Sequence, residues 1–244
     1  MKSIILCEGS SDFILLQYYM RTVNRWEHDK NNKLRFTNAI ARSCVLTKAD
    51  SMLCIAGCGG CTKIIPALDS ILDRNNISAE AEAFDNIIII TDRDEIGTEN
   101  NFIWQIEQVM NRYNVQTDVA IKNDVWTECK YFNGHGKKKV VRLLLLVIPF
   151  EQTGAMETFL LDAISESDEY DAVIIEKCND FVDVVDTEKR YLTKRRYITK
   201  AKFDVYFSVR TSAEQFVERQ NILKNIPWEK YSLIQNSFNK LGDL

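Results

Sequence analysis

The chain has 244 residues, of which 45% are hydrophobic and 27% are charged, and its formal net charge is -4. This is the balance of an ordinary globular protein with enough length for a buried core, and the slightly acidic total gives no overall attraction to nucleic acid. Every apolar stretch is shorter than the roughly 20 residues of a membrane-spanning helix, so we expect neither export nor a membrane anchor.

The seven cysteines are odd in number and scattered along the chain. Cys7 and Cys54 lie in apolar runs, where a reduced thiol packs as a small hydrophobic group. This usage predicts a cytoplasmic protein. Cys58 and Cys61 form a Cys-x-x-Cys pair, but no second Cys or His pair at suitable spacing accompanies it, so a structural zinc site lacks half of its ligands.

Three segments in the first half of the chain share one pattern, in which an apolar run is followed by a turn and an amphipathic helix. They cover 4–23, 51–72 and 86–113, and the second has glycines between its apolar run and its helix. Hydroxyl side chains at the starts of the first and third helices are the expected caps: Ser10 or Ser11, and Thr98.

A further apolar run starts at Leu143, after a sequence typical of a hairpin with "FNGHGKKK" at its tip. The apolar runs are continuous rather than alternating, and helices follow them. This pattern predicts an α/β fold with a mostly parallel sheet and helices on both faces. We expect the α/β domain to cover 1–150 and a helical C-terminal extension to cover 151–244.

The predicted extension has two helix-start signals. "TSAE" at 211–214 is typical of a capping box, and Pro227 is expected to open a helix whose apolar stripe runs to Leu241. We expect the stripe to pack on the α/β domain. The alternative is that it faces a partner protein.

Acidic residues follow two of the predicted strands. "EGSSD" places Glu8 directly after the first apolar run and Asp12 four residues later, and "DRDEIG" places Asp92 and Asp94 after another. Ligands of parallel sheets bind beyond the carboxyl ends of the strands, where these acids converge if their strands are neighbours. Carboxylates so close together repel unless a cation neutralises them, and hard oxygen ligands favour Mg²⁺. For Asp12 the alternative is an acid that complements the helix dipole.

These acidic sequences resemble the Glu-Gly-x-x-Asp and Asp-x-Asp-x-x-Gly motifs of the toprim domain of topoisomerases, primases and OLD-type nucleases, over residues 1–150. The resemblance implies a toprim-like sheet and a Mg²⁺ (or Mn²⁺) site for chemistry on nucleic-acid phosphodiesters. It makes Glu8 a general acid or base or a metal ligand, and it makes Asp92 and Asp94 metal ligands, with Asp12 a further candidate. Three glycines look like the glycine-rich turn of small toprim-like proteins, which leaves Cys58 and Cys61 incidental: Gly57, Gly59 and Gly60.

"TGAMETFLLDAI" resembles a Gly-x-x-Glu helix start that follows the sheet in small stand-alone toprim relatives and OLD-type nucleases. By this resemblance Glu157 is a candidate metal ligand. The alternative is an ordinary amphipathic helix, in which an acid near the start is favoured by the helix dipole.

A basic stretch, "KRYLTKRRYITKAK", follows a strongly acidic stretch at 166–188. Its cations are candidates for contacts with phosphates, and its tyrosines are candidates for stacking on bases. The alternative is that the cations neutralise the acidic stretch. Either Lys200 or Lys202 is a candidate stabiliser of a pentavalent phosphate, as lysines are in some OLD-type sites. The candidate nucleic-acid contacts are Lys194, Arg195, Arg196 and Tyr197.

Length argues against a topoisomerase or a primase, because both need further domains. We therefore expect a metal-dependent toprim-type nuclease that acts on DNA or RNA, in which a water attacks the phosphodiester in line and Glu8 moves the proton. The alternative is a non-catalytic subunit that binds metal or nucleic acid and acts with a partner ATPase.

Overall fold

The computed structural model describes residues 1–32, 34, 36, 39–78, 82–211 and 219–244. Its centre is an eight-stranded sheet with the strand order β2-β3-β4-β1-β5-β8-β7-β6. The strands are β1 (Lys2–Cys7), β2 (Glu27–His28), β3 (Arg42–Lys48), β4 (Ser51–Gly57), β5 (Asn86–Asp92), β6 (Gln116–Thr117), β7 (Thr127–Phe132) and β8 (Lys138–Ile148).

The central strands β4, β1, β5 and β8 are parallel to one another. β3 and β7 flank them in the antiparallel direction, and the short edge strands β2 and β6 pair antiparallel with β3 and β7. β7 and β8 form the expected hairpin. Continuous apolar runs such as Ile87–Ile90 are buried because helices cover both faces of the sheet. The predicted α/β fold is confirmed.

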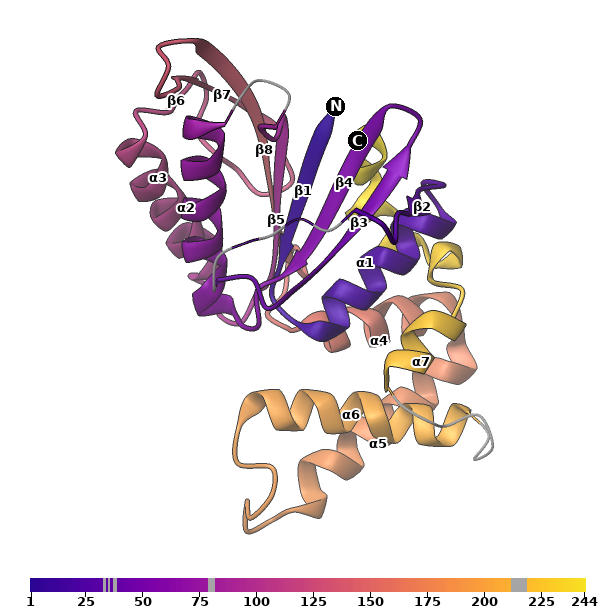
Figure 1. The fold of residues 1–244 in the computed structure, drawn as a ribbon. Coiled ribbons are helices and arrows are strands. Elements are labelled where there is room, and N and C mark those ends of the chain that lie inside the picture. Colours follow the sequence, from indigo (N-terminus) through magenta and orange to yellow (C-terminus); the bar gives the residue numbers. More distant parts are fainter. Residues whose placement is uncertain (33, 35, 37–38, 79–81, 212–218) are drawn as a thin grey trace.

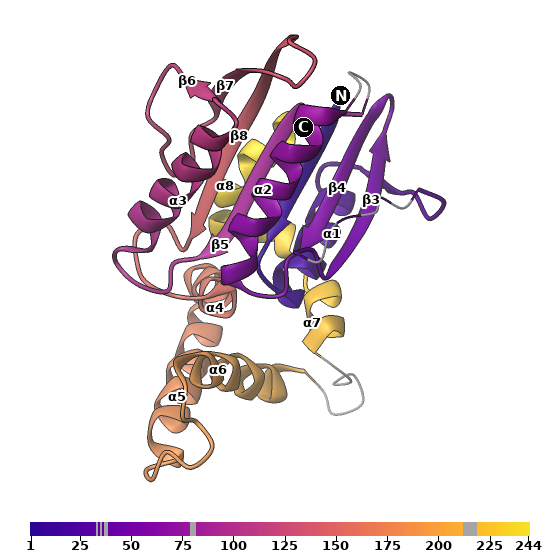
Figure 2. The same ribbon diagram turned by 60° about the vertical axis from the view of Figure 1, so that its left-hand side comes forward.

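Helices cover both faces of the sheet, and α5 and α6 lie beyond its edge (Figure 1). Figure 2 shows α2 and α3 in front of the sheet and α8 behind it. The helices are α1 (Ser10–Thr22), α2 (Cys61–Ile77), α3 (Thr98–Arg112), α4 (Met156–Ser167), α5 (Glu169–Val185), α6 (Arg195–Arg210), α7 (Arg219–Asn225) and α8 (Ser232–Phe238). Among the described residues, no helix has both the length and the apolar composition that crossing a bilayer requires.

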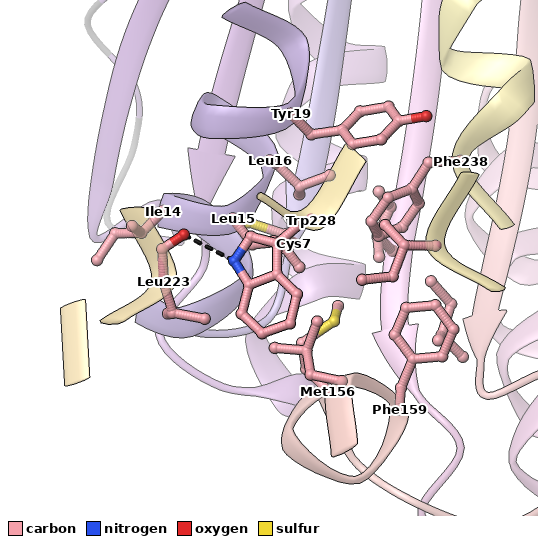
Figure 3. Packing of buried hydrophobic residues seen from close by; sticks show 14 of the residues in the cluster. Cys7, Ile14, Leu15, Leu16, Tyr19, Met156, Phe159, Leu223, Trp228 and Phe238 are labelled. Atoms are coloured by element: carbon pink, nitrogen blue, oxygen red, sulfur yellow. Dashed lines mark hydrogen bonds between the residues drawn. The ribbon is translucent and has the colours of Figure 1, made fainter. Parts of the chain in front are cut away.

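The C-terminal helices help to build one of the two hydrophobic cores, on the sheet face that α1 covers. Trp228 is fully buried, and its indole Nε1 donates a hydrogen bond of 2.8 Å to the carbonyl oxygen of Leu223 (Figure 3). Phe238 of α8 packs edge-on against Tyr19 of α1, with ring centroids 5.2 Å apart. The C-terminal segment is thus integral to the packing around β1, and the apolar stripe after Pro227 packs on the α/β part as expected.

Several local predictions were wrong. The N-cap of α1 is Gly9 and that of α3 is Gly97, so no hydroxyl side chain caps these helices. The hydroxyl of Thr98 instead accepts a hydrogen bond of 2.9 Å from the backbone N–H of Glu95. The segment after Pro227 is not one helix, because α8 lies between the 3-10 turns Trp228–Lys230 and Asn239–Asp243. Of the "TSAE" motif, 212–214 lie outside the described residues.

Helices α5 and α6 form a hairpin beyond the sheet edge at which β1 and β5 end (Figure 1). Lys202 of α6 forms an ion pair of 2.7 Å with Asp183 of α5, and Arg210 forms one of 3.7 Å with Asp171. Part of the basic stretch therefore does neutralise the acidic stretch before it. The start of α6 instead points back toward the strand ends.

Candidate metal centre and cleft

The register of the sheet aligns the ends of the strands that carry the acids. Cys7, the last residue of β1, pairs with Gly57 of β4 on one side and with Ile90 of β5 on the other. Glu8 follows β1 directly, and Asp92 ends β5. The expected neighbourhood of these two strands is confirmed, and both acids lie at the carboxyl edge of the sheet.

A glycine turn fixes the backbone at Glu8. The backbone N–H groups of Gly59 and Gly60 each donate a hydrogen bond of 2.9 Å to the carbonyl oxygen of Glu8. These glycines have φ values of 85° and 139°, a region that residues with a Cβ rarely adopt. The turn between β4 and α2 therefore requires glycine, and it ties the end of β4 to the residue after β1.

The side chain of Glu8 lies among other acids. Burial first, and then the charges of Asp12 and Asp94, raise the pKa of Glu8 from an ordinary value near 4.5 to about 7. Its Oε2 atom is buried, and no described residue provides a hydrogen-bond partner for it. A buried carboxylate oxygen without a donor is unfavourable, and a bound cation would relieve it.

Asp12 lies in the first turn of α1 and is only 5% exposed. Its Oδ2 accepts a hydrogen bond of 2.7 Å from the backbone N–H of Gly9, which closes the start of the helix. Burial nevertheless raises the pKa of Asp12 to about 6, and the charge of Glu157 adds to the rise. Asp12 is thus both a helix-start acid and a member of the acidic cluster.

Asp92 connects β5 to the start of α4. Its Oδ1 accepts a hydrogen bond of 2.9 Å from the backbone N–H of Met156. Burial, followed by the charges of Asp12 and Glu8, raises the pKa of Asp92 well above its usual range. A Cβ at Gly154 would lie 3.1 Å from the side chain of Thr158, so the close approach of this segment favours glycine.

Glu157 joins the same cluster from α4. It is 5% exposed, and its Oε1 accepts a hydrogen bond of 3.2 Å from the hydroxyl of Ser11. The sequence offered two interpretations of Glu157, and the structure agrees with both: the side chain lies in the first turn of α4, where the helix dipole favours an acid, and besides burial its charge contributes to the raised pKa of Asp12 and Asp92.

A thiol completes the central group. One ligand atom each from Glu8, Cys61 and Asp94 lie within 4.8 Å of one another. The sequence interpretation treated Cys61 as incidental, yet it is the first residue of α2 and therefore lies at the same sheet edge. Its position directly after the glycine turn was the signal that could have identified it.

Arg93 supports the loop that carries the aspartates, a role that the sequence interpretation missed. Its Nε donates to the carbonyl oxygen of Pro149 at 2.7 Å, and its Nη2 forms an ion pair of 2.8 Å with Glu99. Its backbone also bonds with Gly154 and Ile148. Because Arg93 points into these contacts, Asp92 and Asp94 on either side of it are held at the cluster.

A cleft of about 810 Å³ lies over the acidic cluster, and its second wall is basic. Arg195, Arg196 and Lys200 of α6 line it together with Thr199. The guanidinium of Arg195 donates to the carbonyl oxygen of Asp94, which joins the two walls. The charge of Lys200 lowers the pKa of Asp12, so this ammonium group acts across the cleft.

The remaining candidates lie outside the cleft lining. Lys202 pairs with Asp183 on α5, so the structure favours Lys200 over Lys202 as the lysine directed toward the acids. Lys194 and Tyr197 lie beside the lining residue Arg196, with the ammonium and guanidinium groups over the tyrosine ring.

The residues of the cluster fit a divalent cation. Carboxylates from Glu8, Asp92 and Asp94 supply hard oxygen donors, and Asp12 and Glu157 add charge beside them. The unpartnered Oε2 of Glu8 provides an observation from the structure itself that favours a cation. With the basic wall opposite, the cleft can bind a cation and an anion side by side.

Comparisons with known proteins concern the family and the fold. A family model described as "Protein of unknown function (DUF3226)" matches residues 2–239. The fold is similar to that of a hypothetical protein from Pyrococcus horikoshii OT3, with a TM-score of 0.52 and 15% identity over 98% of this chain and 99% of that chain. No curated protein matches the sequence.

Proposed function

The chain belongs to DUF3226, a family of proteins of unknown function, and we propose from its cleft that it is a metal-dependent nuclease. The reaction is hydrolysis of a phosphodiester bond in DNA or RNA. One observation carries the proposal: a cluster of acids, most of them buried or partly buried, with an unpartnered carboxylate oxygen on Glu8, faces a cationic wall across a cleft. A divalent cation and a phosphate are together the ligand pair that complements both walls.

The acids divide into central and supporting groups. Glu8 and Asp94 are the proposed metal ligands, because their carboxylate oxygens lie close together at the cleft floor. Asp92 contributes its Oδ2, since its Oδ1 is already bonded to the backbone N–H of Met156. Asp12 and Glu157, which are each 5% exposed, add negative charge from behind. Mg²⁺ or Mn²⁺ bound there supplies Lewis acidity and lowers the pKa of water.

Glu8 is also the proposed proton carrier. In the metal-free protein its pKa is raised to about 7, mainly by burial. A carboxyl group with a pKa near neutrality exchanges protons more readily at pH 7 than an ordinary glutamate. A bound cation would lower this pKa and keep Glu8 ionised, which is the form that removes a proton from water.

The basic wall is the proposed binding surface for the anionic substrate. Arg196 and Lys200 line the cleft opposite the acids. In hydrolysis of a phosphodiester, negative charge increases on the phosphoryl oxygens, and preorganised cations stabilise that change. Lys200 is the proposed electrostatic stabiliser, because its charge already acts on Asp12.

The motif resemblance supports the same class of reaction. The Glu-Gly-x-x-Asp sequence follows β1, and the Asp-x-Asp sequence begins at the end of the neighbouring strand β5. The toprim resemblance implies such an arrangement for enzymes that act on nucleic-acid phosphodiesters. It adds to the proposal but does not carry it.

The test is incubation of the purified protein with labelled DNA and RNA in the presence of Mg²⁺, Mn²⁺ or a chelator. We expect cleavage that requires the cation and that Glu8→Gln and Asp94→Asn abolish. Matched controls are Glu128→Gln and Asp50→Asn, which change exposed acids away from the cleft. Unchanged cleavage by Glu8→Gln would contradict the proposal.

Failure of the wild-type protein to cleave, with metal binding intact, would favour the other class of function. The chain would then be a subunit that binds metal or nucleic acid and acts with a partner ATPase. Loss of both cleavage and metal binding would refute the acidic site itself.

A further inference from the structure

We propose that the cleft takes an unpaired, single-stranded segment of nucleic acid and that Tyr197, flanked by Lys194 and Arg196, stacks on one of its bases. The inference deepens the proposed function and rests on it for the class of substrate. It concerns whether the protein binds single-stranded or duplex nucleic acid, which the acidic cluster alone does not specify.

Tyr197 has the surroundings of a stacking platform. Its side chain is 38% exposed, and the guanidinium of Arg196 and the ammonium of Lys194 lie 5.0 Å and 5.9 Å from its ring centroid. Arg196 also donates a hydrogen bond of 3.2 Å to the phenol oxygen. An exposed aromatic ring held by cations offers stacking to a base and charge to its phosphate at one place.

The cations around this ring remain available for an anion. Among the described residues, Lys202 and Arg210 of α6 form ion pairs with α5, whereas Arg196 and Lys200 form none with a carboxylate. Cations in the first turn of a helix oppose the helix dipole, which is a small but real cost. Arg195 and Arg196 occupy that turn in α6, and a bound phosphate would offset the cost.

A second tyrosine with a neighbouring cation lies in the segment before α6. Tyr191 is 71% exposed, and the guanidinium of Arg190 lies 5.3 Å from its ring centroid. The carboxylate of Asp186 accepts hydrogen bonds from the backbone N–H groups of both residues, at 2.8 and 2.9 Å, so the segment is ordered before any ligand binds. One pair of a tyrosine and a cation therefore lies before α6, and another lies at the start of α6.

The size of the cleft favours one strand over two. Its volume is about 810 Å³, and it is walled by the sheet edge on one side and by α6 on the other. Pockets of about 300–1,000 Å³ enclose small-molecule ligands, and an unpaired nucleotide is a ligand of that size. Arg195 also bridges the walls by its bond to the carbonyl oxygen of Asp94. A strand with splayed bases fits between the walls, and its phosphates reach both the acids and the cations.

The experiment is a fluorescence anisotropy titration of labelled single-stranded DNA, single-stranded RNA and the corresponding blunt duplexes. The full chain carrying Glu8→Gln is used in a chelator, so that binding is measured without turnover. We expect at least tenfold tighter binding to single strands than to duplexes. The DNA and RNA arms determine which polynucleotide is preferred.

Substitutions in the same background test the platform. Tyr197→Ala should weaken single-strand binding about tenfold, the scale of one lost stacking contact, and Tyr197→Phe should retain it because the ring remains. Tyr170→Ala is the matched control, because Tyr170 is a 77% exposed tyrosine on α5, whereas Tyr197 directly follows the cleft residue Arg196 on α6. Thermal melting of each variant shows whether the fold is preserved.

Two outcomes would overturn the inference: equal affinity for single strands and duplexes, or equal single-strand affinity of the Tyr197→Ala and Tyr170→Ala proteins. Failure of this inference can be distinguished from failure of the proposed function. If the wild type cleaves a duplex and shows no preference for single strands, only the inference is contradicted. If the protein binds single strands selectively through Tyr197 but cleaves nothing, the inference is supported and only the nuclease proposal is contradicted.

Discussion

The two walls of the cleft are built from opposite kinds of structure. The acidic wall lies at the ends of β1 and β5, and burial raises the pKa of Glu8, Asp12 and Asp92. The basic wall lies on α6, where Arg196 and Lys200 are exposed. Buried like charges oppose folding, whereas exposed cations are well hydrated and cost little. The acidic wall of the metal-free protein therefore opposes folding electrostatically, whereas the basic wall costs little.

The substitution Glu8→Gln should have the largest effect, because it removes a charge from the acidic wall and leaves the basic wall unchanged. We expect cleavage to fall by about 10²–10⁴-fold, the usual contribution of a general acid or base, while the metal-free fold becomes more stable at pH 8. The gain follows because the amide carries no charge among the acids. Single-turnover cleavage and thermal melting in a chelator measure the two effects. A less stable Glu8→Gln protein would contradict the account of the acidic wall.

The second largest expected effect is a change in the free energy of unfolding with pH. Folded Glu8 and Asp12 have pKa values of about 7 and about 6, above the values near 4 of unfolded carboxyl groups. Between these values the folded protein holds protons that the unfolded chain has released, so its stability falls as pH rises. We expect a loss on the order of 4 kcal/mol from about pH 5 to pH 8 in a chelator, with the larger part from Glu8.

Denaturant titrations of wild type and Glu8→Gln across this range provide the measurement. The variant should lose clearly less stability than wild type. Saturating Mn²⁺ should flatten the wild-type curve, because a bound cation favours ionised carboxylates. Identical curves for the two metal-free proteins would show that Glu8 does not titrate as the structure implies.

The thiol in the acidic wall gives a smaller, selective effect. Sulfur ligands favour softer cations, so Cys61→Ser should weaken Cd²⁺ binding about tenfold and leave Mg²⁺ binding nearly unchanged. Calorimetric titrations with the two cations test this difference, and Cys129→Ser, at a buried thiol of β7 outside the cleft lining, is the control. An equal change for both cations would mean that Cys61 shapes the site without binding the metal.

The basic wall should show the smallest effect on stability. Lys200→Gln changes an exposed residue, so the free energy of unfolding should stay within about 0.5 kcal/mol of wild type. Substrate binding should nevertheless weaken and depend less steeply on salt. Lys138→Gln, on the hairpin strand β8, is the matched control. A loss of stability well beyond that of Lys138→Gln would mean that the basic wall is structural.

The acidic wall could be predicted because parallel strands impose it. Residues that follow adjacent parallel strands emerge at one edge, so the places of Glu8, Asp92 and Asp94 follow from the strand pattern. The basic wall depends on how a helical hairpin packs against that edge, for which the sequence carries no local signal. Lys200 and Lys202 show the difference, since positions two apart differ by about 200° around a helix and the sequence leaves both as candidates.

The caps were mispredicted for a similar reason. Serine and threonine are common caps, but Gly9 and Gly97 precede the helices that begin at the two acidic motifs. At α1 the carboxylate of Asp12 accepts the N–H of Gly9, which is the bond that the third helical residue makes in a capping box. Local propensity for a hydroxyl cap was overridden at both acidic motifs.

The most direct test of the account is a calorimetric titration of Mn²⁺ into the wild-type protein and into Glu8→Gln at pH 8. The account predicts saturable binding by the wild type, accompanied by a rise in Tm, and a large loss of both in the variant. Absence of binding by the wild type, or equal binding by both proteins, would contradict the claim that the buried acids at the sheet edge form a metal centre.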